Sequence, residues 1–207
     1  MMQPKTIAGL LEAARSGFGE LPALVSNGTV LRYEDLARKA DRLGAALNNE
    51  PANSGRVVLY LARKAAFAVG LYGTAASGRS AMLCSNEFVP SQLKDLVRRF
   101  RPDALVVDDA SLGEIGREVA GYPGPIFGLD GSGDLSSSVV PRKAAVACGA
   151  NPNSEAVIFF TSGSEGARKS ITISMHLLSE RLPGILSGHG GEFDNEFRSR
   201  PDAGRHR

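Results

Sequence analysis

Short apolar runs alternate with helix-length segments through the middle of the chain, and this alternation constrains the fold more than any other feature. Four runs are expected to be strands, at residues 57–61, 81–83, 104–107 and 126–129. The first run is continuously apolar, which is typical of a parallel strand covered on both faces. The segments between the runs are long enough for crossover helices. The sequence therefore predicts an α/β fold in which a parallel sheet lies between two layers of helices.

Helical periodicity fills the spaces between these runs. Apolar residues recur at three- and four-residue steps over 33–48 and predict a helix with one buried stripe. A small-residue helix is expected over 64–76, where Gly70 and Gly73 indicate close packing against the sheet. We expect the other helices at residues 6–14, 93–100 and 112–120.

Two segments have the composition of turns and loops. Asn27-Gly28 separates two short apolar runs and predicts a β-hairpin, because both residues accept positive φ. Residues 131–154 are rich in Gly, Ser, Pro and Asn, so we expect a surface linker with room for one short strand near Val139. We assign no chemistry to this linker.

The most informative motif follows the apolar run at residues 156–160. Residues 161–170 read Thr-Ser-Gly-Ser-Glu-Gly-Ala-Arg-Lys-Ser, a decapeptide rich in hydroxyl groups that also holds two glycines and a lysine. Glycines let backbone N–H groups turn toward an anion, hydroxyls donate hydrogen bonds, and a lysine adds a point charge. Composition alone fits a phosphate-binding loop and an ordinary polar turn about equally well.

The order of residues favours the phosphate-binding interpretation. The segment resembles the signature of the adenylate-forming superfamily of acyl-CoA synthetases, luciferases and peptide-synthetase adenylation domains, roughly Thr-Ser-Gly-Ser/Thr-Thr-Gly-x-Pro-Lys-Gly. Three positions depart from it, at Glu165, Arg168 and Ser170. The matching positions, which we take as candidate nucleotide-binding residues, are Thr161, Ser162, Gly163, Ser164, Gly166 and Lys169. The order of elements from about residue 21 to Lys169 also resembles the start of these enzymes.

The resemblance implies a two-step reaction. A carboxylic acid attacks ATP, bound with Mg²⁺, to give an acyl-adenylate, and a thiol of coenzyme A or carrier-protein pantetheine then takes the acyl group. Lys169 and the loop hydroxyls would hold the β- and γ-phosphates. The family's later motifs for magnesium, adenine and ribose have no matching position here, so no catalytic residue is assigned and little complete turnover is expected.

Two alternatives stay open. A catalytically silent nucleotide-binding fragment would keep the fold without the reaction. A P-loop nucleotide triphosphatase is the other, since Gly163, Lys169 and Ser170 fit its spacing. However, Arg168 replaces the second glycine, and residues 170–174 alternate like a strand where a P-loop requires a helix.

Composition bounds the remaining possibilities. The net charge of +2 does not indicate nucleic acid or an anionic membrane as a partner. Cys84 and Cys148 lack metal or redox spacing and are expected to be reduced, buried thiols. No apolar run approaches the length of a membrane span and no secretory signal is evident, so a cytoplasmic location is expected. The sequence does not indicate an oligomeric state or the acid substrate.

The end of the chain changes character. We expect residues 1–182 to form a partial AMP-binding N-terminal domain and residues 183–207 to be a disordered tail, because the tail is rich in glycine and has little apolar periodicity. One explanation is that the reading frame shifts or ends early near residue 180. The genomic sequence downstream would test this.

Overall fold

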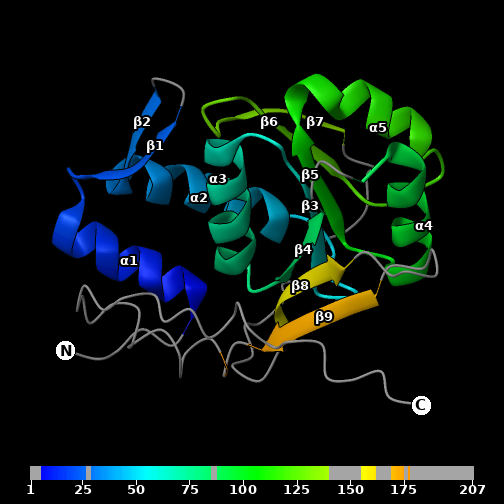
Figure 1. Cartoon of the computed structure of the whole chain (residues 1–207), viewed down its shortest axis with the longest axis horizontal. Coiled ribbons are helices and arrows are strands. Elements are labelled where there is room, and N and C mark those ends of the chain that lie inside the picture. Colours follow the sequence, from blue (N-terminus) through cyan, green and yellow to red (C-terminus); the bar gives the residue numbers. More distant parts are fainter. Residues whose placement is uncertain are drawn as a thin grey trace, which may run out of the picture.

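The computed structural model describes residues 6–26, 29–84, 88–139, 155–161, 169–174 and 177. Within them a seven-stranded sheet lies between two groups of helices, beside a small two-stranded hairpin (Figure 1). The helices are α1 (Ile7–Phe18), α2 (Tyr33–Asn48), α3 (Lys64–Ala76), α4 (Pro90–Phe100), the short 3₁₀ helix η1 (Asp109–Ser111) and α5 (Leu112–Glu118). The strands are β1 (Pro22–Ser26), β2 (Thr29–Arg32), β3 (Arg56–Tyr60), β4 (Ser80–Cys84), β5 (Ala104–Asp108), β6 (Ile126–Leu129), β7 (Leu135–Val139), β8 (Glu155–Thr161) and β9 (Lys169–Ser174). The predicted α/β fold with an αβα arrangement is confirmed.

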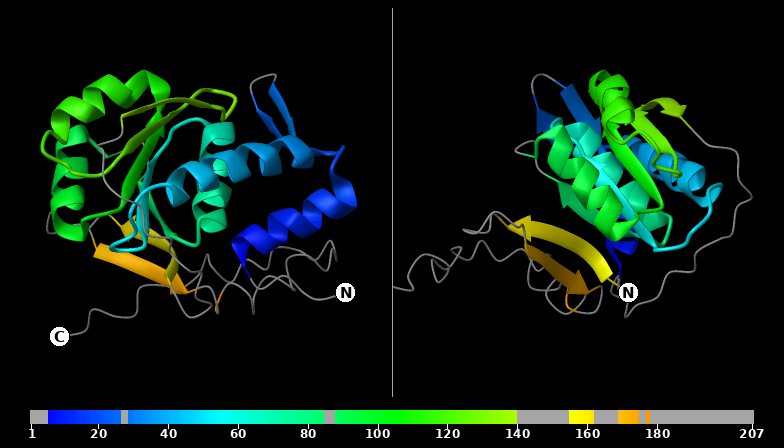
Figure 2. Two further views of the ribbon diagram at one scale, coloured as in Figure 1. Left: turned by 180° about the vertical axis from the view of Figure 1, so that it is seen from behind. Right: turned by 90° about the vertical axis from the view of Figure 1, so that its right-hand side faces the viewer.

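The large sheet is mixed, although most of it is parallel. Its strand order is β7-β6-β5-β3-β4-β8-β9. The five strands in the middle run parallel, whereas β7 pairs antiparallel with β6 and β9 pairs antiparallel with β8. Each antiparallel strand follows its partner directly along the chain, so no crossover helix is needed there. Figure 2 shows the β8–β9 pair at the end of the sheet away from β6 and β7.

Alternate residues of the strands enter two separate cores. Helices α1, α2 and α3 cover one face of the sheet, and α4 and α5 cover the other (Figure 1). On β3, Val57 and Leu59 enter the first core and Val58 enters the second. This burial on both faces explains why the strands read as continuous apolar runs rather than as alternating ones.

Two predicted helices have the expected bounds, α2 over Tyr33–Asn48 and α3 over Lys64–Ala76. The two predicted glycines of α3 lie in close contacts, but not both against the sheet. A Cβ at Gly70 would lie 2.7 Å from Leu61 Cδ1, directly after β3. A Cβ at Gly73 would instead lie 2.8 Å from Leu43 Cδ2 of α2. Gly73 therefore lets two helices approach each other, which corrects the prediction for that residue.

The hairpin and the expected linker have different outcomes. Strands β1 and β2 pair antiparallel as predicted, while the turn Asn27-Gly28 lies outside the described residues. The linker prediction missed the extent of β7, which is a regular edge strand paired with β6. Residues 140–154 and the predicted tail at 183–207 lie outside the described residues. The proposed domain bounds therefore stay predictions.

Candidate functional site

Strands β8 and β9 position the phosphate-loop motif at the carboxyl edge of the sheet. Buried residues 156–158 anchor β8, which runs parallel to β4 and ends at Thr161. Thr161 pairs with Lys169, the first residue of β9, and Phe160 pairs with Ser170. The segment 162–168 is thus joined at its base by a paired strand ladder. The carboxyl edge of a parallel sheet is where open α/β sheets bind ligands.

The six candidate residues divide into two groups. Thr161 and Lys169 lie in the strands that flank the loop, directly opposite each other in the ladder. Ser162, Gly163, Ser164 and Gly166 lie outside the described residues. The structure thus brings together the two ends of the motif, and the contacts of its six residues with a nucleotide stay predictions.

The element that follows the loop distinguishes the two phosphate-binding motifs. A P-loop opens a helix whose N-terminus faces the phosphates. Here the loop leads into β9, which pairs with β8 from Lys169 to Ser174. The prediction of a strand over residues 170–174 is confirmed, and the P-loop alternative lacks its required context.

Polar groups that sequence reasoning missed lie at the same edge, where the connections from β3 and β5 diverge. The chain leaves β3 toward β4 through α3, and leaves β5 toward β6 through α5. The buried Asp108 ends β5, and its Oδ2 accepts a 2.7 Å hydrogen bond from the backbone N–H of Ala62. Arg63 Nη1 lies 3.7 Å from Asp109 Oδ1. Such divergence points are common ligand sites, and polar residues directly after buried runs were the available sequence signal.

These groups stand apart from the loop. Strands β4 and β3 separate β8 from β5, and at about 4.8 Å per strand the separation is roughly 14 Å. Asp108 Oδ1 is buried without a hydrogen-bond partner among the described residues.

A compact polar network closes the turn between β6 and β7. Asp130 Oδ1 accepts hydrogen bonds from the backbone N–H groups of Ser132 and Asp134, and Lys39 Nζ of α2 donates to Asp134 Oδ2 at 2.5 Å. Partial burial opposes ionisation of Asp130, but hydrogen bonds from Ser132 and Asp134 outweigh it and lower its pKa. The hydrogen bond from Lys39 is the main cause that lowers the pKa of Asp134. The network fastens α2 to the sheet edge and has no open coordination site.

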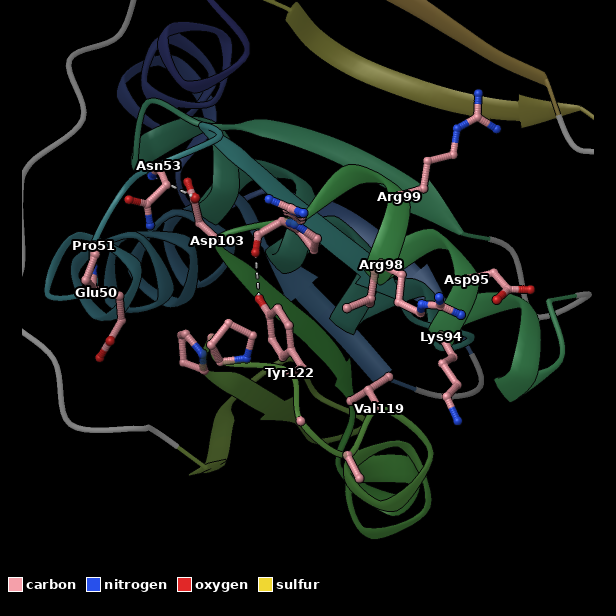
Figure 3. A pocket seen from close by; sticks show the side chains of 18 residues that line it. Glu50, Pro51, Asn53, Lys94, Asp95, Arg98, Arg99, Asp103, Val119 and Tyr122 are labelled. Carbon is pink, nitrogen blue, oxygen red and sulfur yellow. Dashed lines mark hydrogen bonds between the residues drawn. The ribbon is translucent and has the colours of Figure 1, made fainter.

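A hollow of about 1310 Å³ lies at the opposite, amino edge of the sheet. The loop before β3, the second half of α4 and the loop before β6 surround it (Figure 3). The end of β8 and the start of β9 lie at the other edge of the sheet. We therefore treat it as separate from the phosphate loop, whose position follows from strand direction.

The described residues bear on three other predictions. Cys84 is buried and forms no disulfide among the described residues, and Cys148 lies outside them. Across the described ranges, no group of three or more His, Cys, Asp or Glu side chains could hold a metal ion. None of the helices that the structure describes is both long enough and apolar enough to cross a membrane.

Comparison with protein families decides the ancestry of this arrangement. The model of the family described as AMP-binding enzyme matches residues 11–189, most of the chain and all of the loop motif. The chain belongs to the AMP-binding enzyme family. Membership confirms the resemblance drawn from the signature, and it places the chain among adenylate-forming proteins. A search of curated proteins found no match.

Solved structures of adenylate-forming enzymes share the fold. Apo MatB from Rhodopseudomonas palustris has a TM-score of 0.68 and 17% identity, and the match covers 89% of this chain and 37% of MatB. The anthranilate CoA ligase AuaEII with anthranoyl-AMP has a TM-score of 0.65 and 17% identity, with 85% and 35% covered. The AMPPNP-bound form of the nonribosomal peptide synthetase FmoA3 has a TM-score of 0.68 and 16% identity, with 89% and 19% covered. The chain thus spans well under half the length of these three proteins.

Proposed function

We propose that residues 161–169 bind the triphosphate of ATP, and that the protein serves an adenylate-forming reaction on a carboxylic acid. One observation carries the proposal: the family match includes a loop whose flanking residues, Thr161 and Lys169, pair at the carboxyl edge of the sheet. Related structures support a nucleotide ligand, since MatB has been solved with ATP and FmoA3 with AMPPNP.

In the proposed reaction a carboxylate oxygen of the substrate attacks the α-phosphorus of ATP. The bond from the α-phosphorus to the oxygen bridging the β-phosphate breaks, so acyl-adenylate forms and pyrophosphate leaves. Lys169 and the hydroxyls of Thr161, Ser162 and Ser164 would hold the β- and γ-phosphates, where charge builds on the departing pyrophosphate. Fixed donors aimed at developing charge are an effective source of rate acceleration in such transfers.

The other components follow from the family alone. Mg²⁺ commonly binds through substrate phosphates and one or two carboxylates, so ATP is expected to supply most of its ligands. A thiol of coenzyme A or carrier-protein pantetheine is the proposed acceptor of the acyl group. A cytoplasmic location and the lack of a nucleic-acid partner stay predictions from the sequence.

A second candidate function is nucleotide binding without the reaction. The matches span 19% of FmoA3 and 37% of MatB. An adenylation site that needs groups from the remaining length would bind ATP here without turning it over. Binding and turnover must therefore be measured separately.

Exchange of labelled pyrophosphate into ATP tests the reaction. The full chain would be incubated with Mg²⁺, ATP and a panel of carboxylic acids that includes malonate, anthranilate, 3-methylaspartate and aliphatic acids. Exchange that depends on one acid supports adenylation by this chain. Retained ATP binding without exchange for any acid would support the silent alternative, and release of ADP instead of AMP would contradict the proposal.

A further inference from the structure

The hollow at the amino edge of the sheet is built from three segments of the described chain. Residues 50–53 lead into β3, residues 94–103 form the end of α4 and the loop before β5, and residues 119–125 lead into β6 (Figure 3). The strands that these loops enter, β3, β5 and β6, run parallel to β8, so the loops lie at the edge opposite the end of β8. A ligand here would thus bind the far edge of the same sheet.

The residues that line the hollow include four cations and three carboxyl groups. Its one buried aspartate, Asp103, is occupied, because it accepts 2.8 Å hydrogen bonds from the backbone N–H groups of residues 53–55. Burial raises the pKa of Glu50, which disfavours a charge on that carboxyl. Among the cations, Lys94 lies 4.0 Å from Glu118 and Arg99 lies 5.1 Å from the ring of Phe100.

Two arginines remain available for an anion. Arg98 and Arg101 line the hollow, are exposed, and have no ion pair or side-chain hydrogen bond within the described part of the chain. The exposed Asp95 is the one other free carboxylate on the rim. The helix dipole favours a cation in the last turn of α4, where Arg98 lies. It does not explain the cation of Arg101, which follows the helix in the left-handed conformation. Arg101 has φ 45°, a conformation that favours glycine.

Part of the lining of the hollow is apolar. Tyr122 is partly buried and donates a 2.9 Å hydrogen bond to the carbonyl of Pro102, and burial raises the pKa of its phenol, so the ring stays neutral. Pro125 and Val97 are buried beside it. The volume of about 1310 Å³ exceeds the roughly 300–1,000 Å³ that is usual for small ligands. An extended peptide would fill such a space better than a single small molecule.

We propose that this hollow, lined by Arg98, Arg101 and Tyr122, binds an extended acidic peptide segment of a partner protein. Carboxylates of the peptide would pair with the two arginines, and an apolar side chain between them would pack on the tyrosine and proline floor. The inference does not depend on ATP binding, because the two sites lie at opposite edges of the sheet.

Fluorescence polarisation of a labelled peptide of alternating glutamate and leucine tests the proposal on the full chain. Matched peptides would carry glutamine or lysine in place of glutamate. The test variant combines Arg98→Gln with Arg101→Gly, since glycine suits the backbone at position 101 and should leave the fold intact. Arg42→Gln is the control, because Arg42 is an exposed arginine of α2 on the other face of the sheet and has no ion pair within the described residues.

The glutamate peptide is expected to bind, more weakly as salt rises, and about fivefold more weakly to the double variant. Arg42→Gln and Lys169→Ala should bind it like the unchanged protein. Equal binding of the glutamine peptide, or unchanged binding by the double variant, would overturn the proposal. Binding of phosphatidylserine vesicles without binding of the peptide would also overturn it, in favour of a membrane surface.

Discussion

At the scale of single residues, the structure depends most on buried polar groups whose partners are distant in sequence. Asp103 and Arg79 are both almost fully buried, with Nε of the arginine 3.4 Å from Oδ2 of the aspartate. That contact is an ion pair rather than a well-formed hydrogen bond, since Nε has no hydrogen-bond partner. Asp103 also holds the loop before β3 through three backbone N–H groups.

Replacing Asp103 with asparagine should therefore be costly. The amide keeps one oxygen acceptor, but an NH₂ donor replaces the other. That donor would face backbone N–H groups or Arg79, and the buried charge of Arg79 would lose its partner. We expect the free energy of unfolding to fall by about 3 kcal/mol, measured by urea denaturation. Asp95→Asn, on the exposed face of α4, should change it by less than about 0.5 kcal/mol. Similar losses in the two variants would mean that the Asp103 network contributes little.

At the scale of elements, α2 is held from two directions. Gly73 of α3 allows the close approach of Leu43 and Ala40, and Lys39 reaches the turn between β6 and β7. The first contact is steric and the second is electrostatic, so we expect different effects on stability when each one is changed.

Gly73→Ala should destabilise the protein although alanine is the better helix former. The new methyl group would lie 2.8–3.0 Å from Leu43 and the carbonyl of Ala40, so the helices must separate, at a cost of about 1–3 kcal/mol. Gly116→Ala in α5 is the matched control, because nothing lies within 4 Å of its added Cβ. That variant should gain about 0.5–1 kcal/mol. Chemical denaturation of both proteins gives the comparison, and a stabilised Gly73→Ala protein would refute the close contact.

Lys39→Met should weaken the link from α2 to the β6–β7 turn in a pH-dependent way. The side chain of Asp134 is 43% exposed, so solvent screening limits the expected loss at pH 7 to about 1 kcal/mol. The Lys39 ammonium lowers the pKa of Asp134, so this stabilisation is present above the ordinary aspartate pKa of about 3.9 and is lost as the pH falls through the lowered value. The difference between the two proteins should shrink below about pH 4 in denaturation experiments. A difference that is constant down to about pH 2 would contradict this ion pair.

Local patterns predicted the elements far better than the contacts between them. Helices α2 and α3 matched their predicted bounds because apolar spacing and small residues are visible within one segment. The bond from Lys39 to Asp134 joins residues 95 positions apart, and the hold of Asp103 on residues 53–55 is equally non-local. Only tertiary structure reveals such pairs. The same limit explains why the motif at 161–170 was found, whereas Arg63 and Asp108 at the same edge were not.

At the scale of the whole molecule, one sheet separates two chemically different edges. Its carboxyl edge bears the ends of the phosphate-loop motif, and its amino edge bears the arginine-lined hollow. The AMP-binding family match covers residues of both edges, whereas the loop signature concerns only the first. We therefore expect the two proposed functions to be lost independently, ATP binding in Lys169→Ala and peptide binding in the Arg98→Gln, Arg101→Gly double variant.

Calorimetric titration of the full chain with Mg²⁺–ATP tests the central claim most directly. We predict saturable binding that Lys169→Ala weakens by about 1.5–3 kcal/mol, roughly tenfold to a hundredfold, because a charge-assisted contact to phosphate is lost. Lys94→Ala, which removes an exposed lysine at the amino edge, should leave ATP affinity unchanged. No heat with ATP from folded protein, or equal affinities for the unchanged chain and Lys169→Ala, would contradict the account.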